Sequence, residues 1–142
     1  MTDGVRELDH GAVPALIVLW DVCGLTRPWN DPRRDAERAI DAADAAIQGI
    51  EREDALVASV MVGFDGHRGW VYYVAVLPRW RGGGLGRMLM AAAEAWLRAR
   101  GAPKLQLMVR TDNTAAAGFY AALGLERQPV VTYGRVLDPL DR

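Results

Sequence analysis

A glycine-rich turn between a predicted strand and a predicted helix constrains the fold of this chain more than any other feature. Residues 70–76 are rich in aromatic and β-branched side chains, which is typical of a central strand. Residues 82–84 are glycines, and from Leu85 onward apolar side chains recur at helical spacing. That helix is predicted to end near Gly101, and residues 105–109 alternate as a strand. A strand, a helix and a strand in succession predict a right-handed parallel crossover.

The other segments complete an α/β fold with a mixed, mostly antiparallel sheet of six to seven strands and about four helices. The length of 142 residues suits one domain spanning positions 1–142. Further strands are expected at 5–8, 46–50 and 55–64, with one or two closing strands at 130–136. Further helices are expected at 13–23, from Pro32 to about Asp44 with Asp31 as its cap, and at 114–123, capped by Asp112 or Asn113.

Composition excludes several classes of function. The net charge is −1, from 17 basic and 18 acidic residues, which gives no electrostatic case for nucleic acid or an anionic membrane as partner. Cys23 is the one cysteine, so an intrachain disulfide and a cysteine-rich zinc site are excluded. His10 and His67 lie in unrelated segments, and no metal site is expected. The N-terminus lacks the pattern of a signal peptide, so a cytoplasmic protein is expected.

The glycine-rich turn predicts a binding site for phosphate or pyrophosphate. Without Cβ atoms its backbone N–H groups can approach an anion closely, the helix N-terminus adds unsatisfied donors, and Arg81 adds a full charge. A nucleoside-triphosphate loop needs a Gly-Lys-Ser/Thr ending, which this turn lacks. A dinucleotide fingerprint counted from Gly82 needs glycine where Arg87 stands, and it belongs after a first strand.

Two motifs resemble those of the GCN5-related N-acetyltransferases (GNAT). Arg81, Gly84 and Gly86 match the family's Arg/Gln-x-x-Gly-x-Gly/Ala loop, which cradles the pyrophosphate of coenzyme A. Residues 113–125 are similar to its Asn-x-x-Ala-x-x-Phe-Tyr-x-x-x-Gly-Phe segment. The resemblance extends over nearly the whole chain to Tyr133, and residues 19–32 and 64–69 more narrowly resemble the bacterial YpeA-type acetyltransferases. It implies the GNAT fold and acetyl-CoA as co-substrate.

The resemblance also implies a set of site residues. Asn113 would reach the pantetheine arm of the coenzyme, although it is also an excellent helix N-cap. Tyr120 would lie by the sulfur and protonate, or at least hydrogen-bond, the leaving thiolate, although Phe119 and Tyr120 could both be core aromatics. The full cofactor-binding set is Val74, Ala75, Val76, Arg81, Gly82, Gly83, Gly84, Leu85, Gly86, Arg87, Asn113 and Tyr120, with Tyr120 as the catalytic residue.

The general base is left open. In the ribosomal-protein acetyltransferases of the superfamily a glutamate stands five positions before the asparagine, and here that position is Met108. This difference argues against that class of acceptor. The remaining candidates for the base are Asp65, His67, Tyr72, Asp112 and an ordered water.

The family reaction transfers an acetyl group to a primary amine of a small molecule or peptide. In the superfamily the region between the first two helices covers the acceptor side of the cleft, so Arg27, Trp29 and Asn30 are expected to shape the acceptor pocket. The alternative is a coenzyme-A-binding sensor without efficient catalysis, which the presence of Met108 at the acidic position leaves open. A nucleic-acid-directed acetyltransferase is disfavoured by the net charge of −1. Dimers are common in the superfamily, so a homodimer is an expectation of the resemblance alone.

Overall fold

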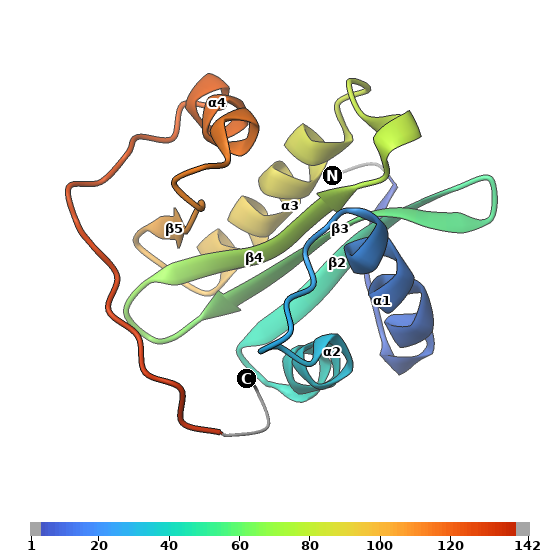
Figure 1. Cartoon of the computed structure of the whole chain (residues 1–142), viewed down its shortest axis with the longest axis horizontal. Helices are drawn as coiled ribbons and strands as arrows, with labels where there is room; N and C mark the ends of the chain where they lie inside the picture. The colour runs from blue at the N-terminus through green and yellow to red at the C-terminus, as the bar shows by residue number, and fades with distance from the viewer. Residues whose placement is uncertain (1–3, 139–142) are drawn as a thin grey trace.

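The computed structural model describes residues 4–138 and has one mixed sheet with helices on both faces (Figure 1). The strand order is β1-β2-β3-β4-β5; β1 to β4 pair antiparallel, and β4 pairs parallel with β5. The strands are β1 (Val5–Glu7), β2 (Ala45–Arg52), β3 (Ala55–Phe64), β4 (Gly69–Val76) and β5 (Leu105–Leu107). The mixed sheet and the parallel crossover are therefore confirmed.

The helices lie in two layers, one on each face of the sheet. Buried side chains of α1 and α2 form one hydrophobic cluster with the sheet, and those of α3 form the other, against which residues of α4 pack. The helices are α1 (Val13–Val22), α2 (Pro32–Asp41), α3 (Leu85–Ala99) and α4 (Thr114–Ala122), with short 3-10 turns η1 (His10–Ala12) and η2 (Pro78–Trp80). This agrees with the four helices expected. None of the helices in residues 4–138 is long and apolar enough to cross a membrane.

The prediction of six to seven strands is wrong, because residues 4–138 contain five strands and none at 130–136. Within the described residues this segment pairs with no strand, and the Thr132 hydroxyl donates to the sulfur of Met108, just beyond β5, at 3.5 Å. Pro129 removes a backbone donor where such a strand would begin. Val131 and Tyr133 remain 78% and 91% exposed, so burial does not favour a strand there.

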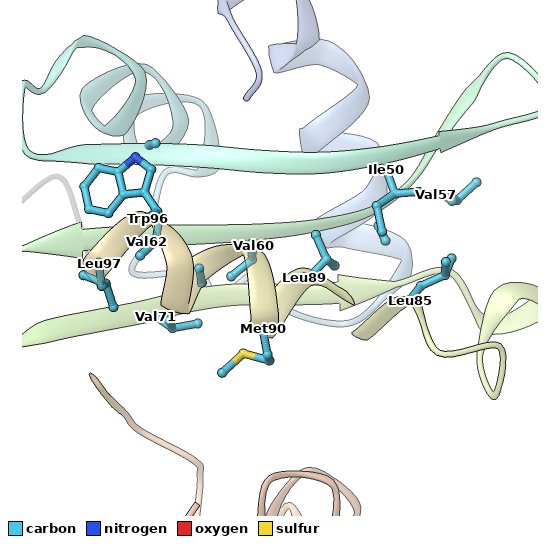
Figure 2. Close-up of a cluster of buried hydrophobic side chains, with 13 residues drawn as sticks. Ile50, Val57, Val60, Val62, Val71, Leu85, Leu89, Met90, Trp96 and Leu97 are labelled. Atoms are coloured by element: carbon cyan, nitrogen blue, oxygen red, sulfur yellow. The ribbon is translucent and has the colours of Figure 1, made fainter. Parts of the chain in front are cut away.

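Helix α3 is held on the sheet by an apolar stripe (Figure 2). Its side chains face inward at the predicted helical spacing, and Leu85, Leu89 and Trp96 are buried. Figure 2 shows these side chains across from those of β3 and β4. The labelled members of this cluster are Ile50, Val57, Val60, Val62, Val71, Leu85, Leu89, Met90, Trp96 and Leu97. The stripe fixes the helix N-terminus, and with it the glycine-rich turn, at the end of β4.

The predicted helix caps are present, and some boundaries move. The Asp31 carboxylate accepts hydrogen bonds from the backbone N–H groups of Arg33 and Arg34 at 3.0 and 3.3 Å. Helix α2 ends at Asp41 rather than near position 44. The β2–β3 turn is shorter than predicted, because Glu53 and Asp54 alone adopt positive φ angles of 52° and 63° while the strands continue to either side.

Strand β4 contains a bulge at Tyr73. Ser59 of β3 lies opposite Ala75, whereas Met61 lies opposite Tyr72, so two residues of β4 face one residue of β3. Tyr73 has a φ of 51°, a left-handed conformation that is uncommon for a non-glycine residue. The bulge bends β4 at its centre.

A buried network holds this bulge. The Ser59 hydroxyl accepts a hydrogen bond from the Trp20 indole N–H at 2.9 Å and donates one to the Tyr73 carbonyl oxygen at 3.1 Å. The Trp20 and Tyr73 rings also stack, with centroids 3.9 Å apart. Among residues 4–138, Ser59 is the one buried polar side chain, and both of its bonds are used to fix β4.

Replacing Ser59 by alanine should therefore destabilise the fold. The change leaves a buried indole N–H and a backbone carbonyl without partners, which is expected to lower the free energy of unfolding by about 2 kcal/mol or more. Urea denaturation measures this change. Thr114→Ala is the control, because Thr114 is exposed on α4 and its replacement should stay within about 0.5 kcal/mol. Equal stability of the two variants would show that the bulge does not depend on the hydroxyl.

Candidate active site

The bulge separates the second half of β4 from β5. The two strands pair only from Gly69 to Val71, beside Leu105–Leu107 (Figure 1). The Leu77 N–H donates to the Val57 carbonyl at 2.9 Å, so alternation along the strand turns the backbone groups of Val74 and Val76 away from β3. These backbone groups therefore face the space beside β4 where β5 no longer pairs with it. Ala75 lies opposite Ser59 of β3, so its backbone groups point toward β3.

The glycine-rich turn leads from β4 into the N-terminus of α3. Gly82 and Gly84 have φ angles of 83° and 86°, which favour glycine. Gly84 is the N-cap of α3, and the first intrahelical bond runs from the Met88 N–H to the Gly84 carbonyl at 3.0 Å. The N–H groups of the first three helical positions therefore have no acceptor within the helix; these are Leu85, Gly86 and Arg87. These N–H groups are the donors that the predicted anion site would use.

Two further residues of the turn have roles that the geometry defines. The exposed Arg81 side chain folds back, and its Nε donates to the Val76 carbonyl at 2.9 Å, which keeps its charge beside the strand end. At Gly86 a Cβ atom would lie 2.9 Å from Cζ of Phe119. A side chain at position 86 would push the Phe119 ring aside, so Gly86 allows α4 to pack closely on α3, next to Tyr120.

A cleft of about 660 Å³ lies beside the bulge. Of the predicted site residues, the structure brings Arg27, Asn30, Val74, Asn113 and Tyr120 together around it. The glycine-rich turn is not part of its lining. The full lining is Leu25, Arg27, Asn30, Asp35, Arg38, Ala39, Ala42, Ala45, Met61, Val71, Tyr72, Tyr73, Val74, Leu107, Met108, Val109, Arg110, Asn113, Ala116 and Tyr120. Trp29 is outside this set, with an exposed fraction of 46%, so the structure gives it no contact with the cleft.

Tyr120 and Asn113 enter the cleft from α4 and its cap. Burial raises the pKa of the Tyr120 phenol, so the hydroxyl remains protonated and can donate at neutral pH. Within residues 4–138 that hydroxyl has no hydrogen-bond partner, and the ring meets Phe119 edge-on with centroids 5.0 Å apart. The Asn113 side chain accepts from the Ala116 N–H at 3.1 Å, which confirms its capping role.

Most candidates for the general base lie outside the cleft. The Asp65 carboxylate accepts from the backbone N–H groups of Arg68 and His67 and from the Trp70 indole at 2.7, 2.8 and 3.1 Å. These bonds lower the pKa of Asp65 and make it the organiser of the β3–β4 turn. His67 and Asp112 do not line the cleft either. Tyr72 does, but burial and the charge of Asp65 raise its pKa.

Asp35 and Tyr73 line the cleft and were not predicted. The Tyr73 hydroxyl donates to the Asp35 carboxylate at 2.6 Å. Burial raises the pKa of Tyr73, and the hydrogen bond and the charge of Asp35 raise it further. In the sequence, Asp35 looks like an acidic residue in the first turn of a helix, where a negative charge interacts favourably with the helix dipole, so nothing marked it as a site residue. Tyr73 looks in the sequence like an ordinary strand residue. Its exceptional position comes from the bulge, which depends on how β4 pairs with β3.

The raised phenol pKa values predict a delayed titration. A raised pKa favours the neutral phenol in the folded state, so its contribution to stability is present below about pH 10 and is lost as the pH rises through the folded-state pKa. Ultraviolet titration of tyrosinate formation should show that Tyr73→Phe and Tyr120→Phe each remove a phenol titrating above the ordinary value. Loss of a phenol that titrates at or below that value would contradict the burial of these hydroxyls.

Comparison with known proteins identifies relatives along nearly the whole chain. The model of the acetyltransferase (GNAT) family matches residues 15–125. An acetyltransferase of Yersinia enterocolitica is 42% identical over 133 residues, which are 94% of this chain and 94% of that protein. An acetyltransferase of Pectobacterium atrosepticum is 45% identical over 133 residues, with the same coverage of 94% of each chain.

Solved structures share the fold. Aminoglycoside N-acetyltransferase AAC(6')-Iy in complex with CoA superposes with a TM-score of 0.81 at 18% identity, covering 94% of each chain. Glucosamine-6-phosphate N-acetyltransferase of Arabidopsis thaliana superposes with a TM-score of 0.71 at 19% identity, covering 94% of this chain and 97% of that one. At these identities the likeness establishes the fold alone.

Proposed function

The chain belongs to the acetyltransferase (GNAT) family, and on that premise we propose that it transfers an acetyl group from acetyl-CoA to a primary amine of a small molecule or peptide. One observation carries the proposal. The bulge at Tyr73 turns the backbone N–H groups of Val74 and Val76 toward the side that β5 vacates, while the Val76 carbonyl is already bonded to Arg81, and Val74 shares a cleft with Tyr120.

Two parts of the chain would hold acetyl-CoA. The N–H groups at the start of α3, together with Arg81, suit its pyrophosphate. The pantetheine arm contains amide groups, which can pair with the strand-like backbone of Val74 and Val76. This arrangement would place the thioester beside Tyr73 and Tyr120, and Asn113 would contact the arm from the cap of α4.

In the reaction the neutral amine attacks the thioester carbon, a C–N bond forms, and the C–S bond breaks. A backbone N–H of β4 would stabilise the oxyanion. The Tyr120 phenol, which its raised pKa keeps protonated at neutral pH, would hydrogen-bond the leaving thiolate and give it a proton, and water would return a proton to the phenolate. Because the side chain of Met108 cannot accept a proton, the proton of the amine would pass to water in the cleft. Tyr72 is the one side-chain candidate from the sequence that reaches the cleft.

Arg27 and Asn30 would form the acceptor end, because they come from the α1–α2 connection and line the cleft opposite α4. The proteins that share the fold include an aminoglycoside N-acetyltransferase and a glucosamine-6-phosphate N-acetyltransferase, so amino sugars belong in a first panel of amines. A coenzyme-A sensor remains the second candidate, favoured by Met108. Tight binding of acetyl-CoA without turnover of any amine would support it.

Reversing the charge of Arg81 should weaken acetyl-CoA binding. Arg81→Glu places a negative charge beside the pyrophosphate, and a lost charge-assisted hydrogen bond corresponds to about tenfold or more in the dissociation constant. Isothermal titration calorimetry measures it. Arg98→Glu makes the same change in the last turn of α3 and should bind normally. Equal affinities of the two variants would remove the glycine-rich turn from the coenzyme site.

Removing the Tyr120 hydroxyl should slow the chemical step. Tyr120→Phe keeps the ring on Phe119 but loses the proton donor, so kcat should fall by about 100-fold. The dissociation constant of acetyl-CoA should change little. An unchanged kcat in steady-state assays, with product release shown to be fast, would exclude Tyr120 as the acid.

A further inference from the structure

The cleft carries more positive than negative charge, although the chain as a whole has a net charge of −1. Its charged lining residues are Arg27, Arg38, Arg110 and Asp35. Arg27 donates only to backbone carbonyls, of Gly24 and Thr26, at 2.8 and 2.9 Å. Within residues 4–138 neither Arg27 nor Arg38 has an acidic partner, so both charges are uncompensated.

These arginines are separate from the coenzyme's phosphate site. No residue between 81 and 87 lines the cleft, so the pyrophosphate would be bound elsewhere, by the turn and the start of α3. Arg27 and Arg38 come instead from the α1–α2 connection and from α2, at the end of the cleft where the proposed function places the acceptor. Their charge therefore faces the acceptor.

Asp35 supplies the negative charge of the cleft. One carboxylate oxygen accepts the Tyr73 hydroxyl, and within the described residues the other accepts no hydrogen bond. Asp35 and Arg38 are three positions apart on α2, so they are neighbours on its surface, about 5–6 Å apart at Cβ. They nevertheless form no ion pair with each other within residues 4–138. The two charges are thus available to one small ligand with charges of both signs.

We propose that the acceptor is a primary amine that also carries an oxyanion, a carboxylate or a phosphate. The amine approaches Asp35 beside the Tyr73 bulge, and the oxyanion binds Arg38 and Arg27. This inference rests on the proposed function, since it names the class of amine used at that site. A ligand with several positive charges meets two uncompensated arginines instead and binds poorly.

Matched amines test the proposal. Phosphoethanolamine, ethanolamine and ethylenediamine form one series, and β-alanine, propylamine and 1,3-diaminopropane form the other. The anionic member of at least one series should exceed its neutral analogue in kcat/KM by roughly tenfold to a hundredfold, and the diamine should be the poorest substrate. The series that shows the preference identifies the oxyanion as phosphate or carboxylate.

A variant pair assigns the preference to the cleft. Arg38→Gln should reduce the advantage of the anionic amine at least tenfold, mainly through KM, while acetyl-CoA affinity stays unchanged. Arg33→Gln is the matched control, because Arg33 is exposed on the same helix and does not line the cleft, and it should keep the full preference. The same loss in both variants would mean that only the general charge of α2 matters, and it would overturn the proposal.

Binding to the CoA-saturated protein separates this proposal from the proposed function. If no amine is acetylated but calorimetry shows that the anionic amines bind more tightly than their neutral analogues, the proposed function fails and the specificity stands. If amines are acetylated and the neutral or dicationic members are preferred in both series, the function stands and the specificity is overturned. Equal binding of all members also overturns it.

Discussion

The hydroxyl of Ser59 is the contact on which the rest of the site depends. It lies between the Trp20 indole and the Tyr73 carbonyl, with hydrogen bonds of 2.9 and 3.1 Å in a place that water does not reach. A carbonyl released from the ladder by a bulge carries a desolvation cost of about 1–3 kcal/mol if it is left unpaired. Ser59 satisfies that carbonyl, and the Trp20 ring supports the left-handed Tyr73 from one side. The bulge thus persists in the middle of a packed sheet.

Two consequences for the site follow from this irregularity, and the packing of α4 on α3 adds a third part of the site. Strand β4 leaves β5 after Val71, which frees a stretch of backbone for a ligand with amide groups. The Tyr73 hydroxyl reaches α2 and orients Asp35. Packing of Phe119 against Gly86 then brings Tyr120 to the same cleft from the other layer. Each layer of helices contributes one side of the site, and the bulge lies between them.

Local chemistry in the sequence predicted part of this arrangement. The α3 stripe, the Asp31 cap and the crossover follow from spacing and helix-end preferences, and the structure confirms them. The bulge, the Tyr73–Asp35 contact and the cleft charges depend on which strands pair and in which register, which no local pattern contains. The apolar residues near 130–136 illustrate the opposite error, because β-propensity without a paired edge does not form a strand. Tyr120 remains a prediction for the chemical step.

Amide hydrogen exchange at β4 tests the central claim most directly. The account predicts that acetyl-CoA slows exchange at Val74 and Val76, while Leu77, already bonded to Val57, changes little. Adenosine 3′,5′-diphosphate, which lacks the pantetheine arm, should leave the Val74 and Val76 amides unprotected. Protection by acetyl-CoA that is confined to the start of α3, with both strand amides unchanged, would contradict the account, because the opening beside β5 would then not be where the coenzyme binds.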